Sequence, residues 1–174
     1  MLVPTNLSNC SLRTWRGDDK NALVHHANNR KVWRNLTEMF PHPYTAADAD
    51  RWISFATRAG PSVHLAIEFE SAAVGGIGVI AGQGISRYTG QFGYWLGESH
   101  WGKGIATAAC RAMIAHVLVQ HQFLRLEAPV FEWNAASMRV LEKVGFQREG
   151  VLRKSVFKDG QLIDSVMYAL VRDA

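Results

Sequence analysis

The apolar pattern of the chain changes period at Gly104, and this change limits the folds open to it. Upstream, residues 63–70, 73–82 and 90–97 alternate in polarity and lie close together, which predicts three antiparallel strands. Downstream, apolar residues recur at helical spacing through residue 117, and a further strand is predicted over 123–131. A strand, a helix and a strand in this order predict a right-handed parallel crossover within an otherwise antiparallel sheet.

The rest of the chain extends this pattern. We expect a first strand over 8–16, a helix over 18–29 with Asp18 as its N-cap, a loop over 38–45, a helix ended by Gly145, and a last hairpin over 156–171 with a type I′ turn at Asp159-Gly160. Thr45 and Asp48 form a variant capping box before a helix whose apolar face is Trp52, Ile53 and Phe55. The sequence therefore predicts one α+β domain over residues 1–174, with a mixed, mostly antiparallel twisted sheet flanked by helices.

Composition excludes several classes of protein. With 48% hydrophobic and 20% charged residues the chain is typical of globular proteins, and no stretch approaches the roughly 18 apolar residues of a membrane span. The first ten residues lack the basic and apolar regions of a secretory signal, so we expect none. Cys10 and Cys110 lie far apart without clustered partners, which indicates two buried thiols, no metal site and a cytoplasmic location.

The charge of the chain favours an anionic ligand. A net charge of +4 and a pI near 9.3 suit a nucleotide phosphate. The 19 Lys and Arg residues are scattered, without a basic run or an alternation with aromatic residues, so we expect no direct binding to nucleic acid.

Three glycines separate the strand over 90–97 from the helix that follows. Gly97, Gly102 and Gly104 surround the point where the first helical amides lack partners and carry partial positive charge. Without a Cβ, such a turn lets a phosphate approach these amides, and Lys103 and Thr107 would add a charge and a hydroxyl. A tight turn with no ligand uses the same glycines, so the residues alone leave both interpretations open. The spacing fits neither a P-loop nor a Rossmann fingerprint.

Two segments resemble a known family. "GYWLGESHWGKGIATAA" and, further along, "NAASMRVLEKVGF" are similar to the GNAT superfamily of N-acetyltransferases, in particular the group of ribosomal-protein-alanine and related N-terminal acetyltransferases. The resemblance extends from "LRTWR" near the start to "GQLIDSVMYAL" near the end. It implies the GNAT fold, acetyl-CoA as co-substrate, and pantetheine lying where strand 90–97 separates from strand 123–131.

The resemblance also implies the cofactor-binding residues. In the family pattern Q/R-x-x-G-x-G/A, Gly104 and Ala106 take the small positions, while Trp101 replaces the usual Gln or Arg. Asn134 is expected to cap its helix and to contact the pantetheine arm. The implied residues are Trp95, Leu96, Gly97, Trp101, Gly102, Lys103, Gly104, Ile105, Ala106, Thr107, Asn134 and Ser137.

The catalytic residues depart from the family pattern. Many members carry a tyrosine that protonates the leaving thiolate, and here that position is Leu141. Ser137, one turn earlier on the same helical face, is the hydroxyl expected to replace it. Glu98 is the candidate base or substrate contact, although a carboxylate there also suits a helix start. His64 and His100 are interpreted as packing residues, and "KSVFKDG" lacks the glutamate that some relatives use.

Without a clear base, the sequence favours an acceptor that loses its proton easily. A protein α-amine has a pKa near 7.7–8.0, against about 10.4 for lysine. We therefore expect acetylation of a protein or peptide N-terminus, with Trp33, Phe40 and Tyr44 either lining the acceptor pocket or simply packing. Two alternatives stay open: acetylation of a small amine such as a polyamine or aminoglycoside, and a non-catalytic acyl-CoA-binding module. A homodimer also stays open.

Overall fold

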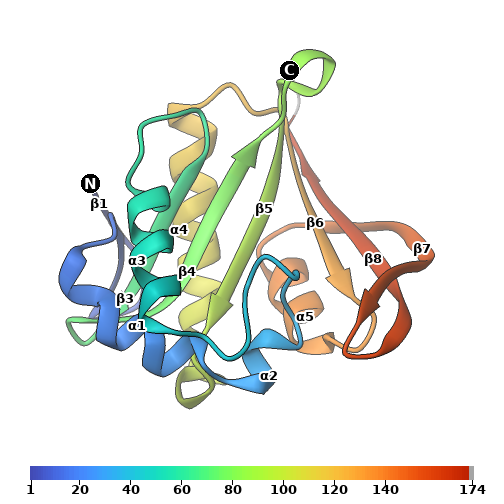
Figure 1. The fold of residues 1–174 in the computed structure, drawn as a ribbon. Coiled ribbons are helices and arrows are strands. Elements are labelled where there is room, and N and C mark those ends of the chain that lie inside the picture. Colours follow the sequence, from blue (N-terminus) through green and yellow to red (C-terminus); the bar gives the residue numbers. More distant parts are fainter. Residues whose placement is uncertain (173–174) are drawn as a thin grey trace.

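The computed structural model describes residues 1–172, which form an eight-stranded sheet with helices on both faces (Figure 1). The strands are β1 (Leu2–Pro4), β2 (Cys10–Arg13), β3 (Val63–Phe69), β4 (Ala72–Ala81), β5 (Thr89–Leu96), β6 (Arg125–Phe131), β7 (Gln147–Lys158) and β8 (Gln161–Val171). The helices are α1 (Lys20–Ala27), α2 (Arg30–Trp33), α3 (Ala46–Ala56), α4 (Ile105–Gln120) and α5 (Ala135–Lys143).

The sheet is mixed and mostly antiparallel, as predicted. Its strand order is β1-β2-β3-β4-β5-β6-β8-β7, and among these neighbours only β5 and β6 pair in parallel. Helix α4 makes the connection between these two strands, which confirms the parallel crossover. The parallel β5–β6 pair divides the sheet into two antiparallel parts, one made of β1 to β5 and the other of β6, β8 and β7 (Figure 1).

Alternation along β5 assigns its side chains to two cores. Phe92 and Leu96 are buried on the face covered by α4, whereas Trp95 packs on the other face with α1 and α3. Figure 1 shows α4 and α5 behind the sheet and α1, α2 and α3 in front of it. The apolar positions predicted at helical spacing in α4 are buried, except for Ala112, which is half-buried; the buried ones are Ile105, Ala108, Ala109, Met113 and Val117.

Local signals placed most elements correctly. Thr45 and Asp48 cap α3 reciprocally, and Gly145 follows α5 with φ of 100°. Asp159 and Gly160 both have positive φ, 53° and 76°, as a type I′ hairpin turn requires. Strand β1 and helix α2 are not predicted from the sequence, because both are too short to show a period.

Four details of the prediction are wrong. The first strand of the last hairpin begins at Gln147 rather than at residue 156. The first strand covers only Cys10–Arg13, and Asp19 rather than Asp18 precedes α1. Asp19 is buried with Arg13, whose guanidinium donates two 2.7 Å hydrogen bonds to its carboxylate, and it ends a 3-10 turn (Gly17–Asp19) that leads into α1. On α3, Phe55 is 49% exposed, because Ala49 and Ala56 occupy the buried positions of that helix.

Cys10 and Cys110 are free and buried, as expected. Among the helices described for residues 1–172, none combines the length and apolar character that crossing a membrane would need. The same residues contain no group of three or more His, Cys, Asp or Glu side chains placed to hold a metal ion.

Candidate active site

Strands β5 and β6 separate after a short pairing. Their parallel register covers only three pairs, Thr89 with Arg125, Gly90 with Leu126 and Gln91 with Glu127. Beyond it, β5 continues to Leu96 and β6 continues to Phe131, and the two ribbons diverge (Figure 1). Over this length β6 keeps its antiparallel pairing with β8, so the separation lies on the β5 side of β6.

The backbone of β5 directs alternate amides toward this separation. The N–H of Gly97 donates to the carbonyl of Val74 at 2.8 Å, and Leu96 lies opposite Gly75 in the register with β4. Along an antiparallel strand, successive backbone N–H groups point alternately to one neighbouring strand and to the other. The N–H of Trp95 therefore points toward β4, as that of Gly97 does, whereas the N–H groups of Tyr94 and Leu96 point toward β6. Of the three β5-end residues predicted to bind pantetheine, Leu96 is therefore the one whose amide points into the separation.

The indole of Trp101 closes the turn after β5. Its Nε1–H donates to the carbonyl of Leu96 at 2.8 Å, although the side chain is 43% exposed. This hydrogen bond orients the carbonyl group of Leu96. Trp101, which stands where the family pattern has Gln or Arg, therefore has a structural role.

The turn ends in an open helix start. Gly102 and Gly104 have φ of 76° and 78°, a region that favours glycine, and nothing lies within 4 Å of where a Cβ would stand on either. Gly104 is the N-cap of α4, no side chain caps the helix, and its first turn carries no acidic residue. The first amides of α4 therefore lack partners inside the helix and have no side-chain cap, and the two glycines before them leave room for a ligand, which fits an anion.

The predicted residues around Gly104 differ in what they offer a ligand. Lys103 is exposed and Thr107 is half-buried, so both side chains are near the surface of the turn. Ile105 is 1% exposed and packs in the core, while Ala106 is half-buried, so these two positions offer backbone amides only.

Ser137 lies opposite β5 and is paired with a tyrosine. Its Oγ is 2.8 Å from the hydroxyl oxygen of Tyr94, and its backbone N–H donates to Oδ1 of Asn134 at 3.2 Å. Asn134 is thus the N-cap that its position predicted. Leu141 is fully buried in the core, so it leaves no hydroxyl at the family's tyrosine position.

Tyr94 is the functional candidate that sequence reasoning missed. Alternation along β5 places it on the same face as Phe92 and Leu96, and that pattern was visible in the sequence. Its partner, Ser137, lies 43 residues later in helix α5, and no local sequence pattern connects the two residues.

Glu98 is held by two neighbours at the start of α2. It forms an ion pair with Lys31 and accepts a 2.8 Å hydrogen bond from Nδ2 of Asn29. The Lys31 and Asn29 hydrogen bonds lower the pKa of Glu98, which makes the carboxylate a weaker base than an ordinary glutamate. Its contacts connect the turn after β5 with α2.

Two imidazoles pack between α1 and the turn. The rings of His26 and His100 are 5.2 Å apart, and a Cβ on Gly97 would stand 2.5 Å from Nδ1 of His26. Burial, with the charges of His25 and His100, lowers the pKa of His26 to about 4. Nδ1 of His100 is buried and has no hydrogen-bond partner among the described residues, and burial lowers the pKa of His100. His64 packs against Trp52 and Phe55 of α3, as expected of a packing residue.

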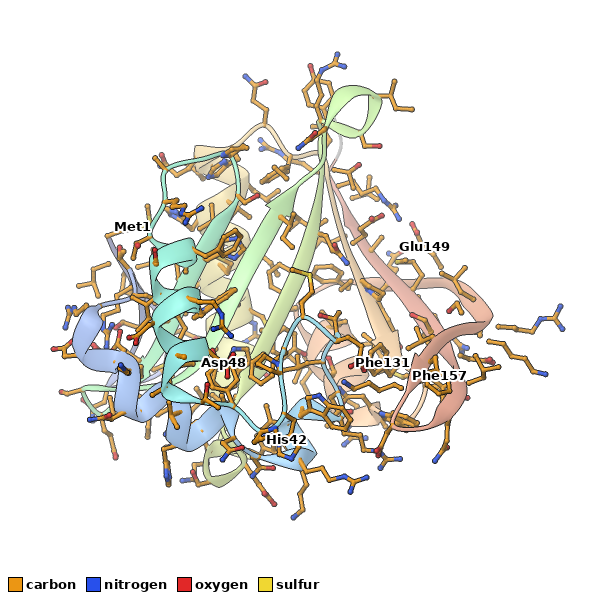
Figure 2. The ribbon with its side chains drawn as sticks, viewed as in Figure 1. Met1, His42, Asp48, Phe131, Glu149 and Phe157 are labelled. Carbon is orange, nitrogen blue, oxygen red and sulfur yellow. The ribbon has the colours of Figure 1, made fainter. Side chains whose placement is uncertain are left out.

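The loop after α2 faces the other side of β5. Phe40 lies 5.4 Å from the Trp95 ring and 5.0 Å from Tyr44. Tyr44 is buried, which raises its pKa to about 12, so it packs in the core. Trp33 stacks on His42, which Figure 2 marks in this loop. Of the three aromatic residues predicted near the acceptor, Phe40 and Trp33 are partly exposed.

The tip of the β7–β8 hairpin closes against the same loop. The ammonium of Lys158, 1% exposed, lies 3.6 Å from the centre of the Trp33 ring and 3.0 Å from Oε1 of Glu38. Asp159 accepts a 2.7 Å hydrogen bond from Arg30. Around this loop, in the described part of the chain, the carboxylates of Glu38, Glu98 and Asp159 are therefore each matched by a cation.

Comparison with known proteins identifies the kind of domain. The family described as "Acetyltransferase (GNAT) domain" matches residues 10–147. Probable N-acetyltransferase YjcK of Bacillus subtilis (strain 168) is 41% identical over 83 residues, 48% of this chain and 46% of that protein. Ribosomal-protein-serine acetyltransferase of Escherichia coli (strain K12) is 34% identical over 100 residues, 56% of each chain. The chain thus spans about half the length of these curated relatives.

Solved structures share the whole architecture. The structure of a RimL ribosomal L7/L12 alpha-N-protein acetyltransferase in complex with coenzyme A superimposes with a TM-score of 0.88 and 21% identity, over 99% of both chains. At this identity the likeness concerns the fold alone.

Proposed function

The chain belongs to the GNAT acetyltransferase family, and we propose that it moves the acetyl group of acetyl-CoA directly to the N-terminal α-amine of a protein or peptide. The observation that carries this proposal is the divergence of β5 from β6 beside the uncapped start of α4. A strand-shaped opening with free amides, next to an anion-binding helix start, suits a long ligand that has a pyrophosphate at one end.

Each part of the opening has a task in this proposal. The amides of Gly104, Ile105 and Ala106 hold the pyrophosphate, with Gly102, Lys103 and Thr107 around them and Asn134 toward the pantetheine arm. Acetyl-CoA supplies the thioester that the amine attacks. The N–H of Leu96 donates to the carbonyl oxygen as negative charge develops there, a contact worth about 3 kcal/mol in comparable sites.

The acetyl group passes directly from sulfur to nitrogen, so the reaction needs no covalent intermediate with the enzyme. The neutral amine forms the new C–N bond, the C–S bond breaks with its electron pair on sulfur, and the amine nitrogen loses its extra proton to solvent. Ser137 donates a hydrogen bond to the departing sulfur. Burial raises the pKa of the Cys110 thiol, which makes this cysteine unsuitable as a nucleophile.

The kind of amine that is acetylated depends on whether a carboxylate can act as a base, and Glu98 is the candidate. With a lowered pKa and two partners, Glu98 suits holding α2 against the turn better than removing a proton from lysine. An α-amine, with a pKa near 7.7–8.0, is partly neutral at pH 7 without a base. Two proteins that this chain resembles are named as protein acetyltransferases, and this also supports a protein acceptor.

The polyamine and aminoglycoside alternative needs carboxylates free to bind a polycation. Around the α2 loop, the described acidic residues Glu38, Glu98 and Asp159 already have cationic partners, so this surface does not favour such a substrate.

The test measures release of CoA thiol from acetyl-CoA with three acceptors in parallel. These are a peptide with a free N-terminal alanine or serine, an N-blocked lysine peptide, and spermine. We expect release with the free N-terminus alone. Release with the lysine peptide or spermine would show that the acceptor is wrong, and binding of acetyl-CoA without release in any arm would favour the binding module.

A further inference from the structure

Two hydroxyl groups meet between β5 and α5, the strand and helix on either side of the proposed pantetheine site. The hydroxyl oxygen of Tyr94 lies 2.8 Å from Oγ of Ser137 and 3.3 Å from its backbone carbonyl oxygen. Tyr94 comes from the part of β5 that has separated from β6, and Ser137 comes from the first turn of the helix that follows β6. The pair therefore joins the two sides of the separation.

Tyr94 is suited to act as a donor at every working pH. Its side chain packs against the core beneath α4, and burial, with the nearby Cys110, raises its pKa. The phenol accordingly stays protonated where an exposed tyrosine would begin to ionise. A neutral phenol always has one proton to donate.

Ser137 has a single proton, and its direction depends on Tyr94. The backbone of Ser137 is fixed by the Asn134 cap, so its Oγ is held on one side of α5. When Tyr94 donates to that Oγ, one lone pair is occupied and the serine proton is left for a second partner. Without Tyr94, the serine hydroxyl is free to turn back to a carbonyl of its own helix, as serine in helices commonly does.

We propose that Tyr94 is a positioning residue that directs the Ser137 hydroxyl toward the sulfur of CoA, so that the pair stabilises the thiolate. This inference rests on the proposed function, because it takes the sulfur to lie at this separation. No proton leaves Tyr94 in the reaction. The C–S bond breaks with its electron pair on sulfur, and that charge accepts the hydrogen bond from Ser137.

The test uses bound CoA alone, so that it does not depend on the acceptor. The pKa of the CoA thiol is measured from thiolate absorbance in complexes with the wild-type protein, Tyr94→Phe, Ser137→Ala and the double variant, with protein alone subtracted. Burial raises the pKa values of Cys10 and Cys110, and subtracting the titration of each protein without CoA removes their thiolate signals.

Tyr168→Phe is the matched control. The Tyr168 hydroxyl donates to Oε1 of Glu142 at 2.8 Å, so this variant also removes a tyrosine contact with α5 but leaves Ser137 untouched. A purely structural effect of loosening α5 would appear in both tyrosine variants.

We expect Ser137→Ala to raise the pKa of bound thiol by about one unit, as the loss of one hydrogen bond to a charged group implies. Tyr94→Phe should raise it in the same direction, the double variant no further than Ser137→Ala, and Tyr168→Phe not at all. At neutral pH, where the bound CoA is a thiol, affinity for CoA should stay close to wild type in all of them. With an active acceptor, kcat should fall about tenfold in Ser137→Ala.

Three results would contradict the inference. A thiol pKa unchanged in Tyr94→Phe would remove the positioning role while leaving the proposed function standing. Effects of the two substitutions that simply add would show that Tyr94 does not act through Ser137. Failure of the wild-type protein to bind CoA would overturn the proposed function and this inference together.

Discussion

Gly104 joins two properties in one residue, a left-handed backbone and the open start of α4. Replacing it with aspartate would put a carboxylate beside the amides that we assign to the pyrophosphate. We expect Gly104→Asp to weaken binding of acetyl-CoA at least a hundredfold, because like charges would meet at the site. The measurement is the dissociation constant from isothermal titration.

Gly104→Asn is the control for that substitution. Asparagine has nearly the same shape as aspartate, tolerates the left-handed region about as well and carries no charge. Any strain at φ of 78° would therefore affect both variants. Equal affinities for acetyl-CoA in the two would mean that the phosphate lies elsewhere.

Local patterns in the sequence predict the glycine turn at Gly102 and Gly104 and the helix cap at Asn134, and the backbone angles and the cap hydrogen bond agree with them. A cofactor-binding role for these residues is implied by the resemblance to the family and not by the local patterns. The Tyr94–Ser137 pair and the Glu98–Lys31 ion pair join residues 43 and 67 positions apart. Such contacts depend on strand register and on how helices dock, which local patterns do not specify.

At the scale of single elements, α3 shows how much its first turn contributes. The Thr45 hydroxyl accepts from the N–H of Asp48, and the Asp48 carboxylate accepts from the N–H of Thr45. We expect Thr45→Ala to lower the free energy of unfolding by about 1 kcal/mol, since one cap hydrogen bond is lost. Urea denaturation measures this change.

Thr45→Ser keeps the hydroxyl and should recover most of that stability. A loss in Thr45→Ser as large as in Thr45→Ala would show that the methyl group, rather than the cap, is responsible.

Elements bounded by a turn or cap motif are predicted from the sequence, whereas short elements without such a motif are not. Asp159 and Gly160 specify a hairpin turn by their backbone preferences, so the turn, β8 and the last three residues of β7 are predicted, whereas the part of β7 from Gln147 to residue 155 is not. Helix α2 has four residues and depends on Asn29 and on the hairpin tip, so no period reveals it. The pattern predicts Asp18 as the N-cap of α1, and the burial of Asp19 against Arg13 depends on a contact between the strand and the turn that no local pattern shows.

For the molecule as a whole, the lowered pKa of His26 makes the free energy of unfolding depend on pH. Its pKa is lowered to about 4 in the folded protein, against about 6.5 in an unfolded chain. Unfolded chains therefore bind more protons between these values, so the free energy of unfolding should fall as pH is lowered from about 6.5 toward 4. Urea denaturation across this range measures the slope.

His26→Gln should reduce that slope, to which His64, His100 and His116 also contribute because their pKa values are lowered in the folded protein as well. His42→Gln, at an exposed position, is the control substitution. The carboxylate of Asp19, whose pKa is also lowered in the folded protein, loses its contribution only at more acidic pH, so the two effects are separable. An identical slope in wild type and His26→Gln would contradict the assignment to His26.

The brief pairing of β5 with β6 has a consequence for the lifetime of the protein. The two antiparallel parts of the sheet, β1 to β5 and β6 to β8, are joined by three residue pairs between β5 and β6. Beyond these pairs, the β5 amides that point toward β6 have no strand to bind. A ligand lying there takes the place of a missing strand, and any ligand that binds only the folded state stabilises it by mass action. Acetyl-CoA would thus be a building element of the sheet as well as a reactant, and a fall in its concentration would leave the two halves easier for a protease to open.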